Sequence, residues 1–228
     1  MQDKLKWNAI GMVKKTKILK KYIEQEQRDI HIDHKKKIAV VSRFLIELNH
    51  LIEQMEKIEK ILIPKLELLF RLTFPTPEMV IFALARPSIR NIFEDLNTHF
   101  KDDVNRPLSK EELMELASSG DAAVVLALIG DAALDLAIVQ ILWDSSLSKT
   151  GELTTKRKNV VSNNNLAIYC DEWGLYSCRL HRLQANPMED AKTETIEHVK
   201  GTLVESIVGV VYQEFGLNKL QRIVSLIQ

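Results

Sequence analysis

Two groups of side chains have types and spacing that could do chemistry. Lys156, Arg157 and Lys158 stand together, and Asn159 and a Ser-Asn-Asn-Asn run at 162–165 follow them. Cations and amide groups at this density suit the phosphate oxygens of a nucleic acid. A solvated loop has the same composition, so both interpretations stay open for this segment.

The second group is Cys170, Cys178 and His181, whose spacing is compatible with zinc. A structural zinc ion usually takes four protein ligands, and no fourth ligand stands nearby, so we expect buried cysteines instead. Two cysteines are too few for a disulfide framework in a chain of 228 residues, which favours a reduced, cytoplasmic setting. The sequence has no phosphate-binding loop, no G-x-S-x-G turn and no dinucleotide fingerprint.

Charge is balanced over the whole chain but not along it. Residues 1–37 hold eleven Lys or Arg against five Asp or Glu. These N-terminal cations could extend an RNA-binding surface or form an ordinary solvated helix face. We see no secretory leader, and Asp131 and Asp135 interrupt the most apolar stretch, so we expect a soluble protein without a membrane segment.

The elements that must position these residues are helical. Apolar residues recur every three or four positions over 38–72, with Pro64 predicting a kink, and 4–30 forms a second, more basic candidate helix. Together they predict a helical hairpin or an antiparallel coiled coil. The Phe-Pro-Thr-Pro run at 74–77 marks the best boundary, giving an N-terminal extension over 1–73 and a main domain over 74–228.

The main domain is also predicted to be all-α. We expect three short helices, a long apolar helix, a polar segment, an irregular stretch that holds Trp173, Tyr176 and both cysteines, and a final helical pair. The three short helices cover 78–84, 89–100 and 110–117, the long apolar helix covers 121–142 and the polar segment covers 144–165. The final pair starts at about 196. A capping box from Ser109 to Glu112 opens the third short helix.

Three segments of this domain resemble the ribonuclease III family. Residues 126–136 read LALIGDAALDL and are similar to the signature of that family. Residues 151–167 read GELTTKRKNVVSNNNLA, and residues 201–212 read GTLVESIVGVVY, each similar to a later family motif. Upstream, ALARPS at 83–88 is similar to a fourth motif. The resemblance covers about residues 78–228 and matches the minimal type, without a double-stranded RNA-binding domain.

The resemblance implies a dimer that cleaves double-stranded RNA with Mg²⁺ held by carboxylates. Asp131 and Glu205 match two of the four metal-ligand positions of the family, whereas Ala127 and Thr202 occupy the other two. Glu152 matches the acid of the second motif, and a further family acid falls on Val124. We therefore assign Asp131, Glu205 and Glu152 as catalytic candidates, with Asp131 and Glu205 as ligands of a weakened Mg²⁺ site.

Nearby acids could replace the missing ligands; Asp121, Asp135, Glu194 and Glu197 are the candidates. In the same family the basic segment with Lys156, Arg157 and Lys158 lies near the RNA.

Three hypotheses follow. The first is a homodimeric, cytoplasmic protein of the ribonuclease III fold that binds double-stranded or structured RNA and takes part in RNA processing with impaired endonuclease activity. The second is an active, atypical Mg²⁺-dependent endoribonuclease that uses Asp131 and Glu205 with Glu152 or Asp121. The third is a protein-interaction scaffold whose N-terminal helices bind a protein partner.

Overall fold

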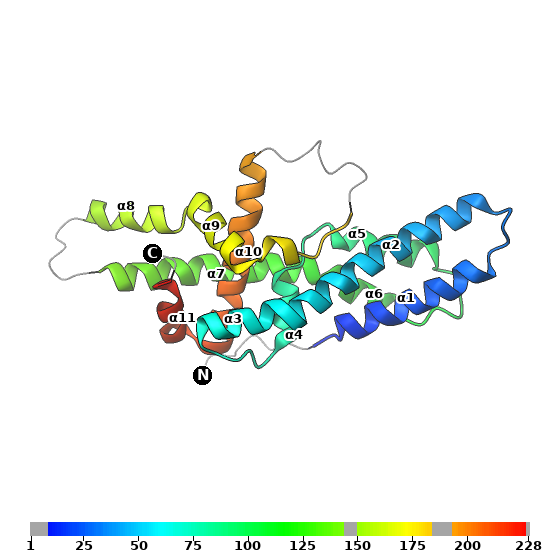
Figure 1. The fold of residues 1–228 in the computed structure, drawn as a ribbon, viewed down its shortest axis with the longest axis horizontal. Coiled ribbons are helices and arrows are strands. Elements are labelled where there is room, and N and C mark those ends of the chain that lie inside the picture. The colour runs from blue at the N-terminus through cyan, green and yellow to red at the C-terminus, as the bar shows by residue number, and fades with distance from the viewer. Residues whose placement is uncertain (1–8, 144–149, 184–192, 227–228) are drawn as a thin grey trace.

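The computed structural model describes residues 9–143, 150–183 and 193–226, with the side chains of 193–195 left out. The described residues form helices joined by turns and loops and contain no strand, only an isolated bridge between Ala85 and Leu180, so the expected all-α class is confirmed. Figure 1 shows an elongated molecule in which the N-terminal hairpin projects at one end and a long helix, α7, runs through the other.

The N-terminal extension is the predicted helical hairpin. Helix α1 (Met12–Asp29) packs antiparallel to α2 (Lys35–Lys57), which continues through a π-helical turn (Ile58–Leu62) into α3 (Ile63–Phe70). The π turn and the start of α3 lie at Pro64, where the sequence predicts a kink, because proline cannot donate the hydrogen bond of a regular helix.

The middle of the chain follows the prediction closely. Its elements are α4 (Pro77–Ala83), α5 (Ile89–His99), α6 (Lys110–Ala117) and α7 (Ser119–Leu142). The capping box is present: Ser109 Oγ accepts a hydrogen bond from the Glu112 amide, and Glu112 Oε2 accepts one from the Ser109 amide at 3.0 Å. This cap fixes where α6 begins, because it satisfies two amide groups that a helix leaves unpaired.

The C-terminal part contains more helix than the sequence predicts. Its elements are α8 (Thr150–Val160), α9 (Asn163–Trp173), a 3₁₀ turn (Tyr176–Cys178), α10 (Thr193–Phe215) and α11 (Leu217–Val224). The predicted irregular stretch is wrong for Cys170 and Trp173, which lie in α9. Ser162 caps the start of α9 and Gly174 ends it at φ 84°, so local capping compensates for a weak apolar pattern.

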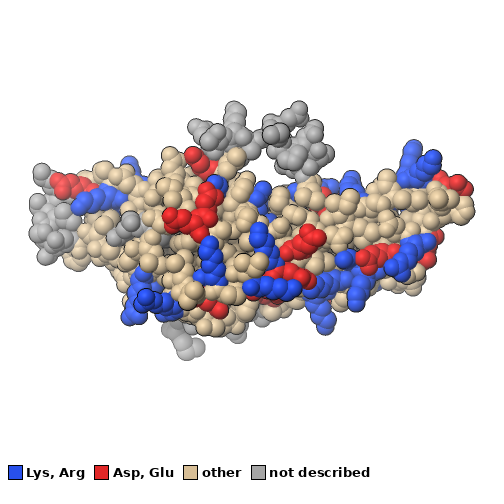
Figure 2. All heavy atoms as spheres, in the orientation of Figure 1, with Lys and Arg blue, Asp and Glu red and all other residues tan. Residues whose placement is uncertain are grey.

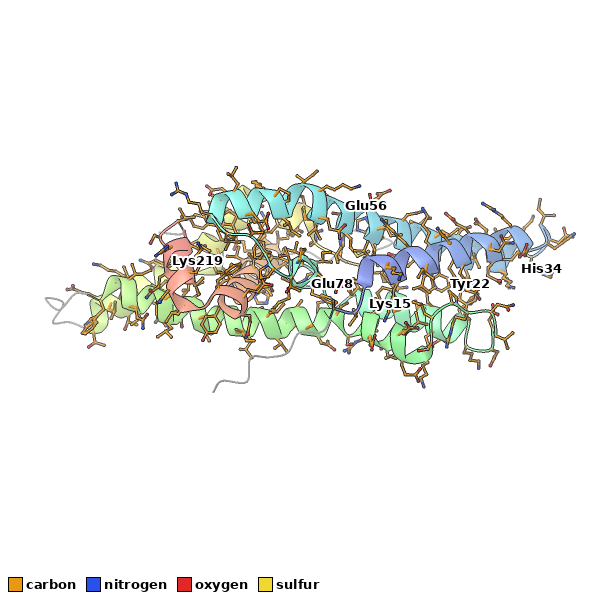
Figure 3. All side chains as sticks on the ribbon, turned by 90° about the horizontal axis from the view of Figure 1, so that it is seen from below. Lys15, Tyr22, His34, Glu56, Glu78 and Lys219 are labelled. Carbon is orange, nitrogen blue, oxygen red and sulfur yellow. The ribbon has the colours of Figure 1, made fainter. Side chains whose placement is uncertain are left out.

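The extension packs on its own main domain. Lys15 of α1 forms ion pairs with Glu112 and Glu115 of α6, and Tyr22 donates a hydrogen bond to Asp103. Figure 3 shows Lys15 and Tyr22 on the side of the hairpin that faces these partners. One cluster of buried apolar side chains runs from Met12 to Val224 without a gap at the predicted boundary, and the division at 73/74 stays a prediction.

A buried acid gives the hairpin a second attachment. Glu47 of α2 is only 4% exposed. It accepts a hydrogen bond from the Leu183 amide at 2.9 Å and lies 3.7 Å from Arg182 Nε. Arg182 also pairs with Asp95 of α5 at 2.8 Å. A buried carboxylate with these partners ties α2 to a segment 136 residues further along the chain.

Within the described residues, one helical stretch, Lys110–Leu142, is long and apolar enough to cross a membrane by length and composition alone. Its most apolar window is 44% buried, because one face of α7 packs against α10. A core helix of this kind meets the same criteria, so the finding is weak support for a membrane segment.

Candidate functional site

The candidate site lies where α10 crosses α7, and two glycines make this crossing close. A Cβ on Gly130 would stand 1.8 Å from the carbonyl oxygen of Glu205, and one on Gly209 would stand 2.1 Å from that of Leu126. Only glycine permits such an approach of two helix backbones. Figure 1 shows α10 running steeply across α7 at this level. The crossing brings Asp131 of α7 beside Glu205 of α10, as the family resemblance implies.

The two carboxyl groups influence one another. Burial, and then the negative charge of Asp131, raise the pKa of Glu205 to about 7. Burial also raises the pKa of Asp131, followed by the charge of Asp135, while Arg157 acts in the opposite direction. Among the described residues neither Asp131 nor Glu205 forms an ion pair. The pair therefore carries negative charge that no neighbouring cation contacts directly, which favours binding of a proton or a metal cation.

The other two ligand positions contribute no carboxylate. Ala127 is 6% exposed, and its methyl side chain offers no oxygen to a metal ion. The Thr202 hydroxyl donates a hydrogen bond to the carbonyl oxygen of His198 at 2.9 Å. Within the described ranges no group of three or more His, Cys, Asp or Glu side chains is arranged to hold a metal ion.

These residues fit Mg²⁺ only in an open form. Mg²⁺ retains several water molecules and is commonly held by one or two carboxylates together with substrate phosphates. Asp131 and Glu205 supply two such carboxylates at one crossing, so they suit a hydrated ion shared with a phosphate group. They do not suit a tight cage made of protein ligands alone.

The nearby acids that could have replaced the missing ligands are mostly engaged elsewhere. Asp135 accepts a hydrogen bond from Arg157 of α8 through Oδ2. Asp121 pairs with Arg90 of α5. Glu197 is partly exposed on α10, and the side chain of Glu194 lies outside the described residues. An arginine partner holds a carboxylate in place, so Asp121 is a poor candidate for a metal ligand. The second oxygen of Asp135, Oδ1, is buried and has no hydrogen-bond partner among the described residues, so this acid stays a candidate beside Asp131.

Helix α8 presents the second motif on a largely exposed element. Glu152, Lys156 and Lys158 are all exposed there, and Glu152 is not among the groups that shift the pKa of Asp131 or Glu205. Arg157 differs from its neighbours, because its ion pair with Asp135 holds α8 against α7. Sequence spacing gives no sign of this pair, which joins positions 22 residues apart on different helices. Lys156 and Lys158 remain accessible to phosphate groups.

An apolar strip on α7 borders the acids, and of its residues only Val124 stands out in the sequence. We define this α7 strip as the exposed side chains of Val124, Val125, Leu128 and Leu136. Leu128 is 69% exposed, which is unusual for a leucine in the middle of an apolar helix. Leu128 follows Val124 by four residues and Val125 by three, and Leu136 follows Leu128 by eight, so these side chains lie on one side of the helix. This periodicity was the signal available in the sequence.

The cysteines and His181 do not come together as ligands. Cys170 and Cys178 are free and buried, as expected, and burial raises the pKa of the Cys170 thiol to about 12. His181 instead lies against His50 of α2, with 3.5 Å between the facing ring nitrogens. Burial, followed by the charge of Arg179, lowers the pKa of His181 to about 4. These groups add to the core rather than to the site.

Comparison with known proteins gives one family. Residues 124–216 match the model described as Ribonuclease III domain. The match begins in the α7 strip and ends after α10. It therefore contains the part of α7 from Val124 onward, α8, α9 and α10, and with them the crossing of α7 and α10. It leaves out α1 to α6 and α11. No curated protein matches the chain in sequence.

Proposed function

We propose that this chain, whose residues 124–216 form a ribonuclease III domain, binds double-stranded or structured RNA for RNA processing with little of the family's endonuclease activity. The weak endonuclease activity is proposed because the set of acids where α10 crosses α7 is reduced. Two carboxylates, Asp131 and Glu205, stand beside a buried alanine and a threonine whose hydroxyl already has a partner. Loss of even an outer partner of a metal site commonly reduces metal affinity or activity about 10–100-fold.

RNA binding in this proposal depends on phosphate contacts made by α8. Lys156 and Lys158 are exposed, whereas Arg157 acts mainly to hold the helix. Removing one cation that binds a phosphate should reduce the salt dependence of binding to a duplex by about 0.9 in the log–log slope. The double variant Lys156→Glu, Lys158→Glu should therefore bind duplex RNA more weakly and with a shallower slope. The double variant Lys101→Glu, Lys110→Glu, at two exposed positions outside α8, is the charge-matched control.

A homodimer is part of the same proposal. The α7 strip is an exposed apolar surface next to the acids, and members of the resembling family pack across this helix. Burying such a strip is favourable at about 25 cal/mol per Å² of apolar surface. Leu128→Glu should shift the sedimentation profile of the protein toward the monomer. A cytoplasmic setting also belongs to the proposal, since it is supported by two cysteines that are free rather than paired.

The alternative is an active, atypical Mg²⁺-dependent endoribonuclease. The close pair of uncompensated carboxyls favours it, because an open Mg²⁺ site needs only one or two carboxylates. Glu152 stays a catalytic candidate in this alternative, as an exposed group on α8. A protein-interaction scaffold is the third candidate, and it predicts no salt-sensitive RNA binding at all.

One experiment separates these candidates. Labelled duplex RNA is incubated with the purified protein and Mg²⁺ or Mn²⁺, beside the double variant Asp131→Asn, Glu205→Gln. The double variant Asp102→Asn, Glu59→Gln serves as a matched control, because it removes one Asp and one Glu from exposed positions outside the crossing. We expect salt-sensitive binding without cleavage. Cleavage by the wild type and the control alone would support the active enzyme, and absence of binding would support the scaffold.

A further inference from the structure

A groove of about 1000 Å³ lies on a part of the molecule that the candidate site does not use. It is formed by α3, the end of α9 and α11, which Figure 1 places next to one another. Figure 3 shows Lys219 of α11 beside the end of α3. Helices α3 and α11 both lie outside the residues that match the ribonuclease III domain, so the groove is built largely from features particular to this chain.

The groove is lined by apolar side chains that the fold leaves accessible. Leu68 of α3 is 83% exposed, and Leu69 and Leu226 are also exposed. Trp173 and Ile223 form buried parts of the lining, so the groove reaches the edge of the core. Exposure of such an apolar cluster to water is unfavourable, and exposed apolar patches commonly mark sites where a partner binds.

Cations surround this apolar lining. Lys65, Arg71, Lys219 and Arg222 line the groove together with a single acid, Glu172. Lys65 donates a hydrogen bond to the carbonyl oxygen of Glu172 at 2.6 Å. Lys219 donates one to the carbonyl oxygen of Arg71 at 2.9 Å.

Among the described residues none of these four cations forms an ion pair with a carboxylate, and the lining therefore has a net charge of about +3 at neutral pH. Figure 2 shows Lys and Arg gathered where Figure 1 places α11.

We propose that this groove docks an acidic amphipathic segment of another protein, with bulky apolar side chains over Leu68 and carboxylates on the surrounding lysines and arginines. The cations select a negatively charged partner, and the leucines select one that has apolar side chains to bury. RNA meets the first condition but not the second, because its backbone offers phosphates and sugars with no aliphatic groups to cover the leucines. A protein segment meets both conditions.

The test uses a displayed library of random peptides of about 16 residues, long enough for about four helical turns. Selection runs on the full chain, with counter-selection on Leu68→Asp. The strongest peptide is then synthesised and its Kd measured by fluorescence anisotropy on the wild type, Leu68→Asp and Arg222→Glu. Val104→Asp is the matched control, because Val104 is a 94% exposed apolar residue in the loop between α5 and α6.

We expect enriched sequences to be acidic and to carry leucine, phenylalanine or tryptophan at helical spacing. Each groove variant should raise the Kd of the peptide at least about tenfold, while Val104→Asp should leave it unchanged. Leu68 and Arg222 are exposed, so both variants should keep the far-ultraviolet spectrum and melting temperature of the wild type. If Leu68→Asp failed to fold, Arg222→Glu would still decide the question.

The proposal would be overturned by no enrichment, by enrichment of basic or purely polyanionic sequences, or by equal binding to the wild type and the groove variants. Displacement of the peptide by duplex RNA would also overturn it, since the groove would then be an RNA surface. The proposal would also be overturned if the Kd of the peptide changed with protein concentration because the protein self-associates. The groove would then bind a second copy of the chain. RNA binding by Leu68→Asp should be unchanged, so failure here leaves the RNA proposal standing.

Discussion

Replacing Glu205 by glutamine should stabilise the protein at high pH and leave its stability almost unchanged at low pH. The structure raises the pKa of Glu205 from 4.5 to about 7 through burial and the adjacent charge of Asp131. Above pH 7 the native state must hold a carboxylate that the unfolded chain solvates better. Below pH 4.5 the group is protonated in both states, and its contribution disappears. The wild type therefore loses stability relative to Glu205→Gln as pH rises from 4.5 to 7.

The magnitude follows from the same values. At 1.36 kcal/mol per pKa unit, a pKa of about 7 in place of 4.5 corresponds to at most about 3 kcal/mol. Glu205 retains some contact with water, and solvent screening reduces this figure to about 1–2 kcal/mol. Part of that should vanish in Asp131→Asn, because the charge of Asp131 is the second cause of the higher pKa.

The assay is urea unfolding of wild type and Glu205→Gln at about pH 5 and about pH 8, with and without Mg²⁺. Glu152→Gln is the control, because it removes an acid from an exposed position and should change stability by less than about 0.5 kcal/mol at either pH. Mg²⁺ should narrow the difference at high pH if the pair holds the ion. An equal effect of Glu205→Gln at both pH values would show that the native state does not raise the pKa of Glu205 as described.

Three further predictions concern the elements around the site. Gly130→Ala should cost more than about 3 kcal/mol and alter the native spectrum, because its Cβ would overlap the Glu205 carbonyl, whereas Gly151→Ala has open space; equal melting temperatures would contradict this. Glu47→Ala should lower the free energy of unfolding by about 2–4 kcal/mol, because it removes the buried acceptor that ties α2 to the main domain. Denaturant titration measures this change, and an unchanged free energy would show that the contact does not stabilise the packing of α2. The third concerns His181, whose pKa the structure lowers to about 4. As the pH falls, the unfolded chain binds a proton at this residue before the folded chain does, so the free energy of unfolding should fall by about 1–2 kcal/mol between about pH 6.5 and 4. His181→Gln should flatten that part of the stability profile, and an unchanged profile would contradict the prediction.

The helical class and much of the element order were predictable from sequence because they depend on local signals. The apolar periodicity over 38–72 places one face of α2 and α3 in the core, and Pro64 marks the change of helical form. Ser109 and Glu112 define the start of α6 within four residues of chain. The resemblance to the ribonuclease III family was also readable, because its three motifs are short contiguous segments, and the family match agrees with them.

Local signals were insufficient for α9 and for the condition of the candidate ligands. The sparse apolar pattern around Cys170 predicts irregular structure, yet caps at both ends make it helical. Asp135 has the composition and spacing of a substitute metal ligand, but Arg157 of a different helix pairs with it. The pKa of Glu205 likewise depends on burial against α7, which no spacing along α10 reveals.

The sequence alone therefore determined the helices, their amphipathic faces and the chemical types available at each motif, because these depend on neighbours a few positions apart. Only the tertiary structure decided which acids are left without a partner and which face of α3 stays accessible beside α11. It also joined Glu47 to Leu183 across 136 positions. Such contacts arise from how helices pack, and the energy of a buried or paired charge depends on what packing brings near it.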